Sequence, residues 1–150
     1  MQEFIDALAE NYQLDDYKIK EQSVILKISS TLEEMACPYC NAVSRRVHSI
    51  YEREIQDLPM QNKKVLLLVR TRKMFCDNPK CSKKTFSERH TFAGTKGQKT
   101  RRLENRIILE SVQLSSVNAS SILKAENIDI SKSSVCTLLK KCRPLWISYP

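Results

Sequence analysis

Glycine is scarce in this sequence. Its 150 residues include only two glycines, Gly94 and Gly97, and both lie within residues 91–99. A glycine-rich loop that could hold a phosphate is therefore missing, and no serine or cysteine nucleophile has evident partners. The acids Glu52, Glu54 and Asp57 follow the alternation of an exposed strand and turn. Because no catalytic constellation emerges, we expect that the chain is not an enzyme on its own.

Long hydrophobic runs are also lacking. The longest uncharged apolar run, residues 65–69, is five residues long, whereas crossing a bilayer takes roughly twenty. We therefore expect no membrane-spanning segment. No apolar leader follows Met1, so we expect a reducing, cytoplasmic and nucleoid-associated location. The 41% apolar and 28% charged residues predict a globular chain.

Positive charge is abundant but unevenly placed. Residues 1–30 carry three basic and six acidic side chains, residues 31–99 fourteen and seven, and residues 100–150 eight and four, for a net charge of +8. A basic surface gains affinity for polyphosphates by releasing counterions, so double-stranded DNA is the expected partner. The alternative is a basic surface that only keeps the protein soluble.

Four of the six cysteines form two close pairs, Cys37/Cys40 and Cys76/Cys81. Two short thiol brackets that are distant in sequence are the pattern of one tetrahedral zinc site, with each bracket forming a tight turn. Pro38 and Pro79 suit such turns. We predict a structural zinc ion bound by Cys37, Cys40, Cys76 and Cys81, with His48 and His90 as structural residues.

The cysteines allow two other interpretations, disulfide bonds and thiol redox chemistry. Disulfides would require a secreted protein, which the start of the chain does not suggest. The tetrad 37–40, Cys-Pro-Tyr-Cys, also occurs in glutaredoxin-like thiol oxidoreductases, in which the first cysteine is the nucleophile. That fold needs a helix after the motif, yet residues 41–46 are of strand type, and the second cysteine pair would stay unexplained.

Hydrophobic periodicity predicts an α+β chain. A short helix within residues 1–14 is followed by a hairpin of strands 17–20 and 23–28, and then by strands 47–55 and 63–75, with Pro59 expected to end the first of them. We expect a small zinc-stapled, zinc-ribbon-like β domain over residues 1–92. A flexible linker, 93–99, would contain both glycines, and an all-α helix-turn-helix domain would occupy residues 100–150.

Three helices are predicted after the linker. Thr100, Asn118 and Ser131 are expected to cap them, and Asn127 is expected to end the second. Their inward side chains would be Leu103, Ile107, Leu109 and Val112 in the first, Ala119, Ile122 and Leu123 in the second, and Val135, Leu138 and Leu139 in the third. Two short helices behind a longer one predict a helix-turn-helix, with an ordinary three-helix bundle as the alternative.

The third helix would then enter the major groove. Lys132, Ser133 and Thr137 are the candidates for base contacts, and Lys140, Lys141 and Arg143 for phosphate contacts. Further candidates are Arg101 and Arg102 on the first helix, and Lys83 and Lys84 beside the second cysteine pair. Phe86, next to these lysines, would either stack on a base or close the core beside the metal.

Several motifs together resemble the N-terminal zinc-binding part of bacterial ISL-three family insertion-sequence transposases. They are Cys-Pro-Tyr-Cys at 37–40, Val-His-Ser-Ile-Tyr at 47–51, Asp-Leu-Pro at 57–59, Phe-Cys-Asp-Asn-Pro-Lys-Cys at 75–81 and Lys-Lys-Thr-Phe-Ser-Glu at 83–88. Residues 100–103 and 131–139 look like that family's helix-turn-helix, so the likeness spans most of residues 37–142.

The resemblance implies a front end that binds the terminal inverted repeats of the element. A full-length relative would add a DDE-type catalytic domain with an acidic triad on an RNase H-like fold. Because the sequence ends at Pro150, we expect a truncated copy without that domain, which would form a homo-oligomer or associate with a full-length transposase. The alternative is a stand-alone zinc-ribbon and helix-turn-helix transcriptional regulator.

Overall fold

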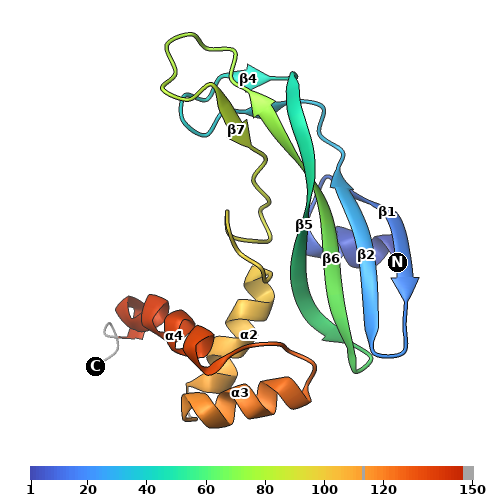
Figure 1. Cartoon of the computed structure of the whole chain (residues 1–150), viewed down its shortest axis with the longest axis vertical. Helices are drawn as coiled ribbons and strands as arrows, with labels where there is room; N and C mark the ends of the chain where they lie inside the picture. Colours follow the sequence, from blue (N-terminus) through green and yellow to red (C-terminus); the bar gives the residue numbers. More distant parts are fainter. Residues whose placement is uncertain (113, 147–150) are drawn as a thin grey trace.

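The computed structural model describes residues 1–112 and 114–146, with the side chains of 142–146 left undescribed. A short helix precedes a β region, and three helices follow it (Figure 1). The predicted α+β class is confirmed. The elements are α1 (Gln2–Leu8), β1 (Tyr12–Ile19), β2 (Ser23–Ser30), β3 (Met35–Ala36), β4 (Val43–Ser44), β5 (Val47–Met60), β6 (Lys63–Phe75), β7 (Thr85–Ser87), α2 (Arg101–Ser111), α3 (Ser116–Ala125) and α4 (Lys132–Trp146).

Strand β6 lies at the centre of the main sheet. The strands follow the order β1-β2-β6-β5, and β7 also pairs with β6. The two predicted hairpins, β1–β2 and β5–β6, are antiparallel, and they are joined by parallel pairing of β2 with β6. The first half of β6 pairs with β2, and its last three residues pair with β7. β5 follows β6 along nearly its whole length, and we refer to this pair as the β5–β6 ribbon.

The prediction that Pro59 ends the first strand of the ribbon is wrong. β5 continues through Pro59 to Met60, with an irregular register between Asp57 and Met60. β5 is an edge strand, where a residue without an N–H leaves no ladder bond unmade. The turn is made by Gln61 and Asn62, whose φ angles are 49° and 58°. Two residues with positive φ form the type I′ turn that suits strand twist.

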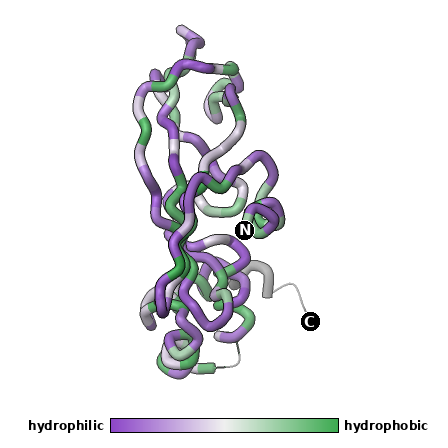
Figure 2. The backbone as a smooth tube through the Cα atoms, turned by 90° about the vertical axis from the view of Figure 1, so that its right-hand side faces the viewer, coloured by the Kyte–Doolittle hydropathy of each residue, from purple (hydrophilic) through white to green (hydrophobic). Residues whose placement is uncertain are grey.

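One face of the sheet is buried under α1. Val65, Leu67 and Val69 of β6 are fully buried on this face, together with Leu26 and Ile55 of the neighbouring strands. Ile5 of α1 is also fully buried there. On the opposite face Leu66 and Leu68 are half-buried and Arg70 is exposed. Figure 2 shows hydrophobic residues concentrated where the central strands run side by side.

The three helices after the β region begin largely where the sequence predicts. Thr100 caps α2 by accepting the Leu103 N–H, and Ser131 accepts the Ser134 N–H at the start of α4. The second predicted cap is wrong. Ser115 caps α3 and accepts the N–H of Asn118, which lies inside the first turn. Asn127 follows α3 with a φ of 63°, as its tolerance of left-handed geometry predicts.

Some of the side chains predicted to form the helical core are exposed. Leu103 and Ile107 of α2, Leu123 of α3 and Val135 of α4 are fully buried, with Leu138 and Leu139 partly buried against them. The predictions for Leu109, Val112 and Ile122 are wrong, because these side chains are 72%, 41% and 43% exposed. Ser111 takes the inward position at the end of α2, because it continues the face of Leu103 and Ile107 at i+4 spacing.

Segment 93–99, the predicted linker, is held against β5. The guanidinium of Arg53 donates to the carbonyls of Gly94 (3.0 Å) and Gly97 (2.8 Å). The Gln56 N–H donates to the Gln98 carbonyl, and the Thr100 N–H donates to the Gln56 carbonyl. These contacts fix the start of α2 relative to the ribbon. Among the described residues, no helix combines the length and apolar character needed to cross a membrane.

Candidate metal centre and basic surface

Two tight turns carry the four predicted metal ligands. In the first, the Asn41 N–H donates to the Cys37 carbonyl, the Cys37 N–H donates to the Ala42 carbonyl, and Asn41 adopts a φ of 62°. In the second, the Cys81 N–H donates to the Asn78 carbonyl at 3.1 Å. Each turn therefore directs a pair of thiols toward the same point, as the two-residue and four-residue spacings predict.

The four sulfurs meet in one cluster. The Sγ atoms of Cys37, Cys40, Cys76 and Cys81 lie within 4.8 Å of one another. Sγ of Cys37 is 3.9 Å from Sγ of Cys81, and Sγ of Cys40 is 3.5 Å from Sγ of Cys76. Four thiolates at 2.3 Å from a tetrahedral zinc would be about 3.8 Å apart. The donor set and the spacing fit zinc, and the predicted ligands are confirmed as one zinc site.

The thiols hold their protons unequally without metal. A hydrogen bond from the backbone of Ala42 lowers the pKa of Cys40 to about 6. A hydrogen bond from the Asn78 backbone lowers the pKa of Cys76, but burial and its hydrogen bonds to the other thiols outweigh this and raise it to about 12. Zinc is bound by thiolates, so metal binding displaces the protons that these thiols hold.

The metal centre rests on a small core of its own. Cys37 and Met74 are fully buried and Phe86 is 4% exposed, and the other ligands pack around them. Phe86 therefore closes the core beside the metal and is not available to stack on a base. Pairing of β6 with β7 places Phe86 opposite Met74. The cation of Arg72 and the carboxylate of Glu88, which is nearly buried, form an ion pair at 3.2 Å across the same strands.

The glutaredoxin-like alternative does not fit this geometry. Cys40 is followed by the short strand β4, which pairs with β3, whereas a redox-active Cys-X-X-Cys lies at the start of a helix. The pair Cys37/Cys40 also shares its cluster with Cys76 and Cys81. Four thiols around one point form a closed structural site, in which no ligand position is left for chemistry.

Both histidines lie outside the metal cluster. His90 is 4% exposed and bridges two strands: its Nδ1 is 2.7 Å from the Tyr12 hydroxyl and its Nε2 is 2.9 Å from Thr71 Oγ1. The Thr71 hydroxyl donates to the Val69 carbonyl, so it accepts from Nε2–H, and the Tyr12 hydroxyl donates to Nδ1. Burial lowers the pKa of His90 to about 4, which keeps this ring neutral. His48 is exposed and packs edge-on against Phe75.

Cations surround the metal centre in two groups. Arg45 and Arg46 form ion pairs with Glu34 (3.0 Å) and Asp77 (2.6 Å). The other group, which we term the lysine cluster, lies in the loop between β6 and β7. It consists of Lys80, Lys83 and Lys84. All three side chains are exposed, and none takes part in an ion pair within the described part of the chain.

The predicted DNA contacts of the third helix gather on α4. Five of these side chains are exposed: Lys132, Ser133, Thr137, Lys140 and Lys141. The side chain of the sixth, Arg143, lies outside the described part of the chain. The first turn of α4 also presents Ser134, whose hydroxyl is hydrogen-bonded to the capping Ser131. None of the three lysines takes part in an ion pair among the described residues.

Arg101 and Arg102 differ in exposure and in their contacts. Arg101 is exposed, whereas Arg102 binds the carboxylate of Asp57 through both Nε (2.8 Å) and Nη2. Asp57 is fully buried and also accepts the Thr100 hydroxyl at 2.7 Å. The guanidinium of Arg102 thus holds α2 to β5. Sequence reasoning missed this role of Asp57, although its i+2 spacing from the buried Ile55 indicates an inward position.

Comparison with known protein families identifies the metal-binding segment. Residues 33–81 match the zinc-finger of transposase IS204/IS1001/IS1096/IS1165. The match covers about a third of the chain and contains all four clustered cysteines. The predicted resemblance is therefore confirmed for this segment, and no catalytic domain is matched. The comparisons with curated proteins and with solved structures found no match.

Proposed function

We propose that this chain is a DNA-binding part of an insertion-sequence transposase and that it binds the terminal repeats of the element. The observation that carries the proposal is the zinc finger itself, because residues 33–81 match a zinc finger of transposases and hold a complete four-cysteine site. Structural zinc fingers of this kind stabilise a small domain that has too little core of its own.

The helices after the zinc finger support a role in DNA binding. α3 and α4 are joined by a short turn that contains Asn127 and Asp129, and α2 packs behind both. In a DNA-binding helix-turn-helix, the second helix of such a pair lies in the major groove and reads bases from its first turns. The exposed first turns of α4 carry Lys132, Ser133 and Thr137, which can donate to base edges and phosphates.

The charge of the chain agrees with this assignment. The end of α4 adds Lys140 and Lys141, and the exposed Arg101 stands at the start of α2. Arg102 is not included among the proposed contacts, because it is engaged with the buried Asp57. Cations that bind phosphates release counterions, so the affinity is expected to fall as salt rises.

The proposal is tested by fluorescence anisotropy with a labelled 30-bp duplex of random sequence. The logarithm of the association constant should fall linearly with the logarithm of the salt concentration, by about 0.9 per phosphate contacted. A Lys140→Ala/Lys141→Ala variant should lower the slope by nearly two. The matched control, Lys18→Ala/Lys27→Ala, removes the same charge from β1 and β2 and should change the slope little. The proposal would be contradicted by an affinity that does not change with salt concentration. It would also be contradicted if both variants showed the same dependence of affinity on salt.

A further inference from the structure

We propose that the chain contacts one DNA duplex at two places about one helical turn apart. α4 makes the first contact, the lysine cluster at the zinc end makes the second, and the β5–β6 ribbon fixes the distance between them. This inference rests on the proposed function, because it concerns the form of the DNA site that such a protein binds.

The lysine cluster is suited to phosphates because its cations are not engaged within the protein. Lys80, Lys83 and Lys84 are exposed and free of ion pairs with described residues, whereas Arg45 and Arg46 beside them are paired with acids. The backbone beneath the cluster is held in place by bonds around the metal site. The Cys76 N–H donates to the Lys84 carbonyl, and the Lys80 N–H donates to the Asn78 side chain. The lysines therefore project from a fixed loop.

The other end of the ribbon holds the turn between α3 and α4. The amide of Gln56 donates to the Asn127 carbonyl (3.1 Å), and the amide of Asn127 donates to the Asn62 carbonyl (2.7 Å). Lys64 forms an ion pair with Asp129. Asn127 and Asp129 lie in the segment that connects α3 with α4. The ribbon therefore directly contacts the part that sets the direction of α4.

The ribbon also holds the start of α2. Asp57 binds Thr100 and Arg102, and Leu58 packs into the helical core beside Leu103 and Ile107. Contacts with both α2 and the α3–α4 turn leave the helices little freedom to rotate about segment 93–99. One strand pair thus connects the metal site with the helices, and a fixed spacing between the two ends follows.

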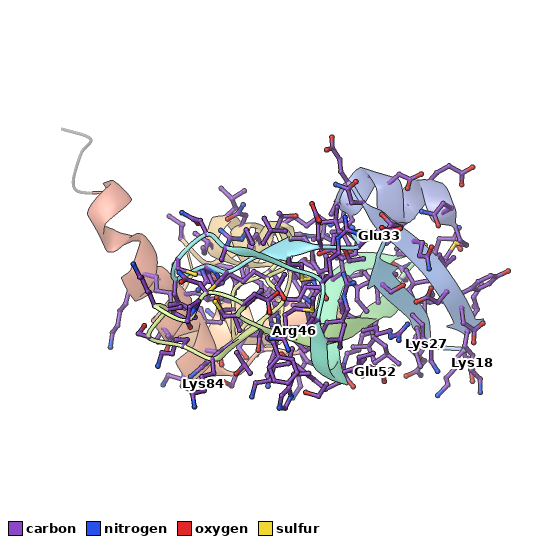
Figure 3. The ribbon with its side chains drawn as sticks, turned by 90° about the horizontal axis from the view of Figure 1, so that it is seen from above. Lys18, Lys27, Glu33, Arg46, Glu52 and Lys84 are labelled. Carbon is purple, nitrogen blue, oxygen red and sulfur yellow. The ribbon has the colours of Figure 1, made fainter. Side chains whose placement is uncertain are left out.

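The two surfaces lie on the same side of the ribbon. In Figures 1 and 3 the loop between β6 and β7 and α4 project in the same direction, and Lys84 lies on that side. Lys18 and Lys27 lie at the opposite side, on β1 and β2 (Figure 3). A straight duplex laid along the ribbon on the first side can therefore reach both α4 and the lysine cluster.

The length of the ribbon gives the spacing of the two contacts. Between Lys64, which binds Asp129, and Phe75, which precedes the ligand Cys76, β6 advances about 36 Å at 3.3 Å per residue. One turn of B-DNA is about 34–36 Å. The geometry points to two separate contacts on the same face of the duplex.

The test uses a duplex enriched from a random 40-bp library by the full zinc-loaded chain, followed by hydroxyl-radical footprinting. Two protected segments should appear, with centres about 10–11 bp apart. Lys83→Ala/Lys84→Ala should remove protection of one segment only and lower the salt slope by about 1.8. The control Lys18→Ala/Lys27→Ala should leave both segments protected, and equal zinc contents would show that the metal site is intact.

A second duplex, with five base pairs inserted between the protected segments, tests the fixed spacing. Half a helical turn moves one segment to the far side, so affinity should fall to that of the Lys83→Ala/Lys84→Ala variant on the original duplex. The inference would be overturned if the footprint showed a single protected segment that Lys83→Ala/Lys84→Ala does not change. It would also be overturned if the insertion did not change the affinity. In both cases the proposed function would stand. If no duplex is enriched at all, the proposed function itself fails.

Discussion

Replacing Asp57 by asparagine should weaken the junction between the β5–β6 ribbon and the helices. The Asp57 carboxylate is fully buried and accepts from Thr100 and twice from Arg102. Asparagine of the same shape offers only one acceptor oxygen, and its NH₂ group would face donors. The Arg102 cation would lose its counter-charge, although its side chain is 32% exposed and water can reach it. We expect a loss of about 2–4 kcal/mol in the free energy of unfolding.

Urea unfolding followed by circular dichroism measures this loss in the zinc-loaded protein. At about 2 kcal/mol per molar urea, the midpoint should fall by about 1–2 M. A matched control is Glu34→Gln, which removes the exposed partner of Arg45 and should change stability by less than about 0.5 kcal/mol. If Asp57→Asn unfolds at the same urea concentration as the wild type, the Asp57 contacts do not hold the helices to the ribbon.

Three further predictions concern the metal, the ribbon turn and the buried histidine. Cys76→Ser should lose zinc and unfold the segment 33–81, because a structural zinc site contributes on the order of 10–16 kcal/mol; a zinc assay that still finds one equivalent would refute the ligand set. Gln61→Gly should stabilise the protein by up to about 1 kcal/mol in thermal unfolding, because Gln61 has a φ of 49°. Relief of this left-handed strain is worth about 1–2 kcal/mol and exceeds the extra chain entropy that glycine brings to the unfolded state, about 0.4–1 kcal/mol; a lower Tm would refute this. The folded pKa of His90 is about 4, below its ordinary 6.5, so its contribution should be complete above pH 6.5 and be lost as pH falls toward 4. A His90→Gln variant should show a shallower loss of stability over this range, and identical pH profiles would contradict the assignment.

The metal centre could be predicted from the sequence because its signal is local. Two cysteine pairs at metal-ligand spacing define the four ligands, and the turns that carry them depend on nearby residues such as Pro38 and Asn41. Helix starts were predictable for the same reason at Thr100 and Ser131. The prediction failed at Asn118, because Ser115, three residues earlier, is an equally good cap, and the chain uses the earlier one.

The arrangement of the elements depends on contacts that local patterns do not encode. The parallel pairing of β2 with β6 joins segments that lie far apart in the chain. The sequence of neither strand specifies which other strand it pairs with. Asp57 illustrates the same limit. A lone acid beside a turn is usually exposed, and it is buried here because Thr100 and Arg102, from a distant segment, supply its donors. Residues 93–99 contain both glycines and indicate a linker, yet Arg53 binds two of their carbonyls.

Recognition of the ends of an insertion sequence can be tested through the sequence of the DNA that the chain selects. The full zinc-loaded chain would be used to enrich duplexes from a random library, and the enriched motif would be compared with the DNA on both sides of its own gene. If the chain recognises the ends of an insertion sequence, the motif should occur on both sides of the gene, in inverted orientation. A motif that occurs once, within a promoter, would show that the chain does not recognise insertion-sequence ends and would indicate a transcriptional regulator.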